Sequence, residues 1–416
     1  MTQLDLSFVR AQFPAFAVPV LSGQAFFENA GGSYPCGAVV DRLHRFYTER
    51  KVQPYAPYPS SELGGAEMDE ARARLSALLG VMNDELSFGP STSANTYVLS
   101  QAVRQWLSGV KGAAIVVTNQ DHEANSGVWR RLSQDGGIEV REWAIDSQTG
   151  HLDPQDLEKL LADGRVKLVC FPHCSNVVAE INPVARICAL AHEAGAYTCV
   201  DGVSYAPHGF VNIDKLGADV YLFSAYKTYG PHQGVMVIRH GLGSVLPAQA
   251  HFFNAKSSHK RFTPSGPDHA QVAACAGMVD YIDALYDHHF SSGASEATAP
   301  VARAEAVHDL MRDHETVILQ PLLDYLAARN DLRLLGPRKA EDRAPTVAIG
   351  LNEDAEATAR ALARFGIMAG GGDFYAVRPL QAMGIDMAKG ILRLSFVHYT
   401  KKAEIDQLIT ALDQVL

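Results

Sequence analysis

From about residue 86 to residue 240, short apolar runs alternate with amphipathic segments. The runs are rich in Val, Ile and Phe and end at polar residues or glycine, which is typical of strands buried in a sheet. Strands are predicted at residues 85–89, 113–118, 138–145, 166–173, 196–201, 219–227 and 234–240. Apolar residues at helical spacing predict helices at residues 91–107, 125–136, 154–164 and 183–195. This alternation predicts an α/β fold with a mostly parallel sheet.

A different pattern follows a small and polar stretch at residues 290–306, which we expect to be a connection. The predicted elements beyond it are helices at 317–330 and 355–366, strands near 332–336 and 346–351, a glycine-rich loop at 369–376, a strand at 391–399 and a final helix. They indicate a smaller α+β domain. We therefore expect an N-terminal segment at residues 1–25, a large domain at 26–290 and a small C-terminal domain at 291–416.

The residues just after the apolar runs carry the candidate chemistry, because ligands of such sheets bind beyond the carboxyl ends of the strands. Most lysines at strand ends are solvated surface groups. Lys227 is different, since it follows a buried run and has aromatic neighbours. Partial desolvation lowers the pKa of such an amine and makes it a nucleophile. Asp201 follows another predicted strand, where it is either a turn or cap residue or an acid facing the same crevice.

A lysine and an acid in these positions suit pyridoxal phosphate (PLP), whose aldehyde binds a lysine and whose pyridine nitrogen pairs with a carboxylate. The stretch at 200–238 that contains both residues reads VDGVSYAPHGFVNIDKLGADVYLFSAYKTYGPHQGVMVI. It resembles the signature of the class V aminotransferase family, which includes cysteine desulfurases and selenocysteine lyases. Further segments resemble the same family, and they lie at residues 25–35, 88–96, 119–129, 171–184 and 391–408. The resemblance implies a fold-type I PLP enzyme whose large domain contains a seven-stranded sheet.

The resemblance also implies a role for each matched position. Lys227 resembles the Schiff-base lysine, Asp201 the partner of the pyridine nitrogen and His122 the residue that stacks on the cofactor ring. Further cofactor-binding positions are Ser91, Thr92, Ser93, Asn176, Ser204, Ser224, Tyr226 and Gly266. Arg393 resembles the arginine that clamps the substrate carboxylate, and Asn29 and Tyr375 are expected to line the substrate pocket. From the residues alone, Ser91 to Ser93 are equally good as helix caps, and Tyr375 and Arg378 as structural residues.

Three departures from the family bear on the reaction. Desulfurases carry a mobile cysteine before the Arg393 strand, whereas no cysteine follows Cys275 here. Cys36 and Cys174 are the cysteines to consider for an approach to the cofactor. Ser204 and Tyr226 stand where desulfurases carry glutamine and histidine. The resemblance thus implies a desulfurase-like C–S or β-lyase without a persulfide-carrying cysteine, working through an external aldimine and a quinonoid. An aminotransferase, an epimerase or a non-catalytic PLP-binding dimer are the alternatives.

Composition limits the partners. The 416 residues include 36 Lys and Arg against 46 Asp and Glu, and no basic cluster stands out, so we expect no nucleic-acid partner. The six cysteines form no CxxC pair, and no metal is expected. No apolar run reaches the length of a membrane span and no signal sequence is evident, so we expect a cytoplasmic protein. The segment 261–273 around Gly266 resembles one that reaches the partner's phosphate, which implies a homodimer with its active sites at the interface and a small amino acid as substrate.

Overall fold

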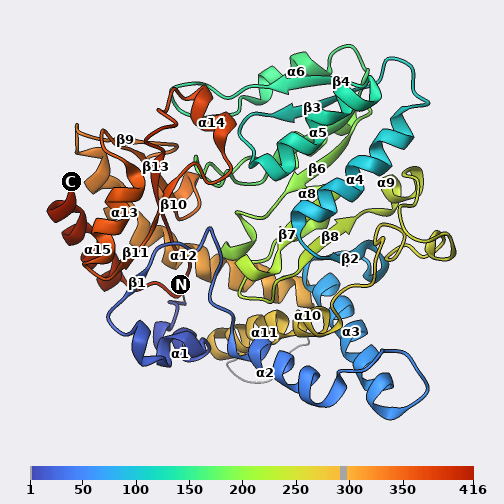
Figure 1. The fold of residues 1–416 in the computed structure, drawn as a ribbon, viewed down its shortest axis with the longest axis horizontal. Helices are drawn as coiled ribbons and strands as arrows, with labels where there is room; N and C mark the ends of the chain where they lie inside the picture. The colour runs from blue at the N-terminus through green and yellow to red at the C-terminus, as the bar shows by residue number, and fades with distance from the viewer. Residues whose placement is uncertain (1, 291–297) are drawn as a thin grey trace.

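The computed structural model describes residues 2–290 and 298–416, and a seven-stranded sheet lies at the centre of its larger part (Figure 1). In spatial order the strands are β2 (Leu86–Gly89), β8 (Gly234–Ile238), β7 (Val220–Ser224), β6 (Tyr197–Asp201), β5 (Val166–Pro172), β3 (Ala114–Thr118) and β4 (Glu139–Trp143). β8 runs antiparallel to its two neighbours, and the other adjacent strands are parallel. The predicted α/β fold with a mostly parallel seven-stranded sheet is confirmed.

Helices cover both faces of this sheet, which explains why its inner strands are apolar on both sides. One face packs against α4 (Thr92–Leu107) and α5 (Glu123–Gly136), and α9 (His240–Val245) follows β8 at the same face. The other face is covered by α2 (Gly37–Arg45), α3 (Pro59–Leu78), α6 (Pro154–Leu161), α7 (Val184–Glu193), α8 (Ile213–Leu216), α10 (His269–Ala274) and α11 (Ala276–Phe290). Within the described ranges, no helix has both the length and the apolar character needed to cross a membrane.

A four-stranded antiparallel sheet forms the smaller part, with the order β12 (Gly370–Gly372), β13 (Ile391–Ser395), β10 (Thr346–Gly350) and β9 (Arg333–Leu334). Its helices are α12 (Pro300–Ala327), α13 (Ala355–Ala363), α14 (Val377–Ala382) and α15 (Lys402–Val415). Side chains of α12, α13 and α15 form a separate apolar core with the sheet, which includes Leu319, Leu362, Leu392 and Leu408. This agrees with the predicted α+β character of the C-terminal region.

The N-terminal segment joins the two parts, a point that the sequence pattern did not decide. Asp5 caps α1 (Leu6–Ala11), and one of its carboxylate oxygens lies 3.1 Å from Nε2 of His288 in α11. Arg10 of α1 forms an ion pair of 3.0 Å with Glu404 of α15. The short strand β1 (Ala25–Phe26) then pairs in parallel with β11 (Ile367–Met368) of the smaller part. The chain therefore crosses the smaller part before it enters the larger one (Figure 1).

The prediction of a connection at residues 290–306 is wrong from Pro300 onward. Proline fits the first turn of a helix, and Ala304 and Val307 begin the buried face of α12. Small residues are common in connections, but alanine is also the best helix former. Residues 291–297 of the predicted connection lie outside the described residues.

The glycine-rich stretch at 369–376 is also not a loop throughout, because Gly370–Gly372 form the edge strand β12. Gly370 lies opposite Arg393 in the register with β13. A Cβ atom on Gly371 would lie 2.3 Å from the carbonyl carbon of Ala355, so glycine allows α13 to pack directly on the strand. Glycine is depleted in strands on average, and close packing overrides that preference here.

Candidate active site

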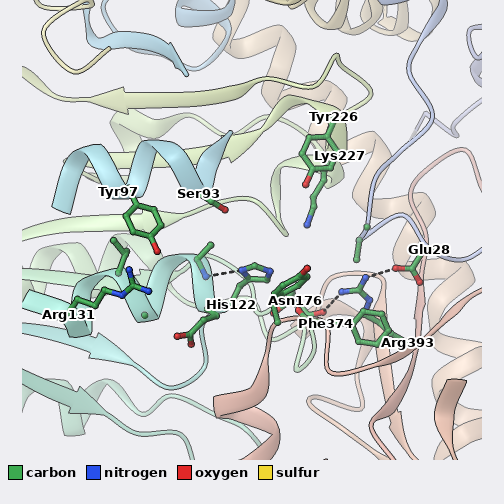
Figure 2. A pocket seen from close by; sticks show the side chains of 17 residues that line it. Glu28, Ser93, Tyr97, His122, Arg131, Asn176, Tyr226, Lys227, Phe374 and Arg393 are labelled. Carbon is green, nitrogen blue, oxygen red and sulfur yellow. Dashed lines mark hydrogen bonds and ion pairs between the residues drawn. The ribbon is translucent and has the colours of Figure 1, made fainter. Parts of the chain in front are cut away.

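Two adjoining cavities lie beyond the carboxyl ends of β5, β6 and β7. The smaller one, about 70 Å³, is lined by predicted site residues, which are Thr92, Ser93, His122, Asn176, Asp201, Ser204, Ser224, Tyr226 and Lys227. The larger one, about 650 Å³, shares Ser93, His122, Asn176, Tyr226 and Lys227 with it and adds Tyr375 and Arg393 (Figure 2). The structure therefore gathers most of the predicted site residues from both parts of the molecule.

Three predicted site residues do not line these two cavities. Ser91 caps α4, and its hydroxyl accepts a hydrogen bond of 3.1 Å from the amide of Ala94. Asn29 lines a separate hollow of about 10 Å³ that Lys227 also reaches. Its amide donates to two backbone carbonyls and accepts from the hydroxyl of Tyr399, so its side chain is fully engaged. Gly266 lines another cavity, of about 380 Å³, that shares no lining residue with these two.

Lys227 ends a short 3₁₀ turn that follows β7 directly, so the strand fixes the position of its backbone. Figure 2 shows its amine pointing toward the space between His122 and Arg393. Burial lowers the pKa of the amine to about 8, and the Arg393 guanidinium lowers it too, while Asp201 and Glu28 act in the opposite direction. About a tenth of this amine is therefore unprotonated at pH 7, far more than for a solvated lysine, and this form can act as a nucleophile or a base.

Asp201 is the last residue of β6 and is buried. One carboxylate oxygen accepts a hydrogen bond of 2.9 Å from the amide of Val203. Burial raises the pKa of the carboxyl to about 6, although the Val203 amide and the charge of Lys227 favour its ionised form. A buried carboxylate with so few donors has capacity left to pair with a cation in the cavity.

The N-terminus of α4 provides a cradle for an anion. Thr92 and Ser93 in its first turn line the smaller cavity, where the free amides of a helix start and the dipole of a 16-residue helix favour negative charge. The hydroxyls of Thr92 and Ser224 lie 2.8 Å apart and are both buried. A Cβ atom on Gly234 would lie 2.4 Å from the carbonyl carbon of Ser91, so glycine lets β8 approach the cradle closely. Tyr226, stacked on His232 at 4.8 Å between ring centres, adds a phenol at the rim.

His122 and Asn176 line both cavities and lie near each other in Figure 2. His122 caps α5, and its Nδ1 accepts a hydrogen bond of 3.1 Å from the amide of Ala124. Burial, together with the charges of Lys227 and Arg393, lowers the pKa of the imidazole to about 4, so the ring is neutral. Asn176 donates to the carbonyl of Phe374 at 2.9 Å, while its own Oδ1 is buried and has no hydrogen-bond partner among the described residues.

Arg393 reaches the cavity from β13 and is only 4% exposed. Its guanidinium lies 3.8 Å above the ring of Phe374 and forms an ion pair of 2.5 Å with Glu28. Burial lowers the pKa of Arg393, and Glu28 counteracts that shift. The family resemblance implies a place at the substrate pocket for the neighbouring Asn29 but not for Glu28. The available signal was an acidic residue directly after the apolar run of residues 25–27.

The turn at residues 373–375 closes one side of the larger cavity. Phe374 and Tyr375 both have left-handed backbones, with φ values of 51° and 57°, which is uncommon for aromatic residues. The turn is held by the amide of Glu123, which donates 2.8 Å to the carbonyl of Tyr375. Arg378 does not line the cavity and instead binds both carboxylate oxygens of Glu123, at 2.8 and 3.2 Å. Tyr375 itself is 72% exposed, with its ring centre 5.4 Å from that of His122.

The cysteines are buried throughout the described structure. Cys174 lines the smaller cavity, but its thiol donates 3.3 Å to the carbonyl of Ala179, and burial raises its pKa to about 12. Cys36 lies outside the cavities of the site, with its pKa also raised by burial to about 12. A thiol with such a pKa is protonated at neutral pH and is a poor nucleophile.

Comparisons with known proteins agree with this geometry. The class-V aminotransferase family matches residues 25–266 and 290–408. The aminotransferase-like protein FGM3 of Gibberella zeae is 30% identical over 98% of this chain and 98% of its own length. The cysteine desulfurase-like protein ustD of Aspergillus flavus is 27% identical over 99% of this chain and 91% of its own. The apo structure of the cysteine desulfurase from Thermococcus onnurineus has a TM-score of 0.84 at 22% identity, covering 100% of this chain and 99% of that one. The family and the fold expected from the sequence are thereby confirmed.

Proposed function

Because the chain belongs to the class-V aminotransferase family of PLP-dependent enzymes, we propose that it binds PLP between Asp201 and Lys227 and acts on a small amino acid. One observation carries the proposal. A buried carboxylate and an amine with a lowered pKa, from the ends of neighbouring strands, line a single cavity. This combination is costly in an apoprotein and useful once a cationic ring nitrogen and an aldehyde are present.

The residues present fit the cofactor. The cradle formed by the amides of α4 and the hydroxyls of Thr92 and Ser224 suits a phosphate. The unpartnered Oδ1 of Asn176 and the hydroxyl of Ser204 are available for polar groups on the ring. The neutral imidazole of His122 is a flat surface on which an aromatic ring can stack.

PLP supplies an electrophilic aldehyde and a ring that accepts electrons from the substrate Cα. Lys227 would hold the aldehyde of the bound cofactor, and its amine, once released, would take up the proton from the substrate Cα. Asp201 keeps a positive charge at the ring nitrogen, because its own ionised form needs a cationic partner in this buried place. Arg393 binds and orients the substrate carboxylate with its planar fork.

The reaction we favour is the loss of a group from Cβ after the proton leaves Cα. No cysteine stands in residues 369–376, and the thiol of Cys174 is held protonated, so we propose that no persulfide forms on the enzyme. Transamination and epimerisation begin with the same proton removal and are the alternatives. A non-catalytic dimer is a weaker candidate, since Lys227, Asp201 and Arg393 are all in place.

We further propose that the enzyme is a homodimer. Tyr55, Phe252 and Phe253 are exposed aromatic residues, and Tyr55, Phe253 and Gly266 line the same cavity of about 380 Å³. A cluster of exposed aromatic side chains is typical of an interface between subunits. In a dimer, the backbone around Gly266 would reach the phosphate cradle of the partner.

The experiment starts with purified apoprotein and added PLP. We expect a visible absorbance band from the lysine-bound cofactor, which is absent in Lys227→Ala and retained in Lys215→Ala, where the replaced lysine is an exposed partner of Glu305. A band that persists in Lys227→Ala would disprove the assignment of Lys227 as the lysine that binds the cofactor.

Cysteine, cysteine conjugates and common amino acids are then supplied as substrates. Pyruvate and ammonia without a keto acid indicate a lyase, while dependence on a keto acid indicates an aminotransferase. A persulfide bound to an enzyme cysteine would contradict the proposed reaction.

A further inference from the structure

Arg393 has an acidic partner inside the substrate cavity. Glu28 follows β1, and its backbone forms a bridge with Ser395 at the end of β13, so the two elements bring Glu28 and Arg393 together. Its Oε1 lies 2.5 Å from Nη2 of Arg393, and both residues line the cavity of about 650 Å³ (Figure 2). The side chain of Glu28 is 29% exposed, against 4% for that of Arg393. The glutamate thus lies on the open side of a buried cation.

This pair leaves part of each side chain unsatisfied. Nε of Arg393 and Oε2 of Glu28 are buried and have no hydrogen-bond partner among the described residues. A carboxylate can bind the Nη2 and Nε edge of a guanidinium with two parallel hydrogen bonds, but Glu28 uses Nη2 alone. The contact is therefore weaker than the one that an ideally placed carboxylate would make. Phe374, under the guanidinium plane, fixes the direction of that edge.

We propose that Glu28 is an internal competitor that occupies Arg393 in the free enzyme and is displaced by the carboxylate of the substrate. This inference rests on the proposed role of Arg393 in substrate binding. The incoming carboxylate gains two hydrogen bonds where Glu28 had one, while the side chain of Glu28 can turn toward the open cavity. Glu28 is thus a residue that sets substrate affinity, and it keeps the buried Arg393 neutralised when no substrate is bound.

The exchange also affects Lys227. Arg393 lowers the pKa of the amine and Glu28 raises it, so the two charges partly cancel in the free enzyme. A bound substrate carboxylate adds one negative charge to this group and favours a protonated nitrogen at Lys227. Removal of the charge on Glu28 has the opposite effect in the free enzyme, where it leaves Arg393 uncompensated.

The test measures the binding of propionate, which has a carboxylate but no amine. Titration calorimetry follows it with the apoprotein, and the visible band follows it with the PLP-loaded enzyme. We expect Glu28→Gln to lower the dissociation constant about tenfold, as expected for the loss of one charge-assisted competitor. We also expect the pH midpoint of PLP capture by Lys227 to fall. General damage to the site would weaken binding, so an increase in affinity separates competition from a merely structural role.

Controls distinguish this inference from the proposed function. Glu404→Gln breaks another Arg–Glu pair, outside the cavity, and should leave the dissociation constant unchanged. Glu28→Asp keeps the charge on a shorter side chain and should give an intermediate dissociation constant. This variant replaces Glu28→Gln in the test if Glu28→Gln folds poorly. Propionate binding that is lost in Arg393→Ala but is unchanged or weaker in Glu28→Gln and Glu28→Asp would overturn the proposed displacement of Glu28. It would leave the proposed role of Arg393 intact. Propionate binding that survives in Arg393→Ala would instead overturn the proposed carboxylate site.

Discussion

Lys227 is a cation that the fold holds where its charged form is disfavoured. Because burial lowers its pKa from 10.5 to about 8, its unprotonated form becomes abundant as the pH rises through 8. We therefore expect the rate of PLP capture by the apoprotein to rise with pH and to level off above about 8, since only the free amine attacks the aldehyde. Stopped-flow absorbance between pH 6 and 10 measures this rate. A rate that keeps rising up to pH 10 would show that the amine is not desolvated.

Burial also disfavours the charged form of Asp201, and it raises the pKa of this carboxyl from 3.8 to about 6. The folded carboxyl binds protons more tightly than the unfolded one, so its contribution to stability is favourable below pH 3.8 and is lost as the pH rises through 6. We expect Asp201→Asn to stabilise the apoprotein by about 1–3 kcal/mol at pH 8 and by less at pH 5. The asparagine oxygen can still accept from Val203. Urea unfolding at both pH values measures the difference.

The same substitution should lower kcat/KM by about a hundredfold or more, since it removes the charge that holds the ring nitrogen protonated. Stability and activity then change in opposite directions, as expected where a functional group is buried at a cost. An Asp201→Asn variant that is less stable than the wild type at pH 8, or that keeps full activity, would contradict the role proposed for this carboxylate.

At the level of elements, the sequence predicts the site where local rules apply. Lys227 and Asp201 were found because both follow apolar runs, and the ends of parallel strands lie at one edge of a sheet. Glu28 was missed because its contact with Arg393 depends on the bridge between the end of β1 and β13, which joins residues far apart in the chain. The strand β12 was missed for a similar reason, since its glycines are explained only by the packing of α13. Pairings across long sequence separations leave no local pattern.

The turn at 373–375 is an element whose position depends on a few polar contacts. Arg378 binds Glu123 at the start of α5, and both side chains are partly exposed, so the pair contributes less than about 1 kcal/mol to global stability. We expect Arg378→Ala to leave the melting temperature nearly unchanged, to speed hydrogen exchange at residues 370–378 and to raise KM severalfold. Mass spectrometry and steady-state kinetics measure these effects. Arg360→Ala, which removes an exposed ion pair with Glu356, is the matched control. Equal exchange in the two variants would show that Arg378 does not hold the turn.

On the scale of the whole molecule, the site lies where three segments meet. The seven-stranded sheet supplies Asp201, Ser224 and Lys227, and the four-stranded sheet supplies Arg393. The N-terminal segment supplies Glu28 and pairs with the smaller part through β1. A shift between the two parts would therefore change the distance between Lys227 and Arg393, so the geometry of the proposed substrate site depends on how the parts are joined and not on either part alone.

The proposed dimer belongs to the same scale, because the segment around Gly266 does not line the two cavities of the site in its own chain. Phe252 and Phe253 are 90% and 69% exposed, and burying them in an interface would release about 2 kcal/mol each. We expect the double substitution Phe252→Asp and Phe253→Asp to give a folded monomer that retains PLP poorly, because the partner's backbone no longer reaches the phosphate cradle. Sedimentation velocity measures the loss of the dimer, and the cofactor content after gel filtration measures the loss of PLP.

Val317→Asp is the control, because it changes an apolar residue that is 72% exposed on α12 and should leave the dimer intact. A double variant that stays dimeric and retains its cofactor would place the interface on another face.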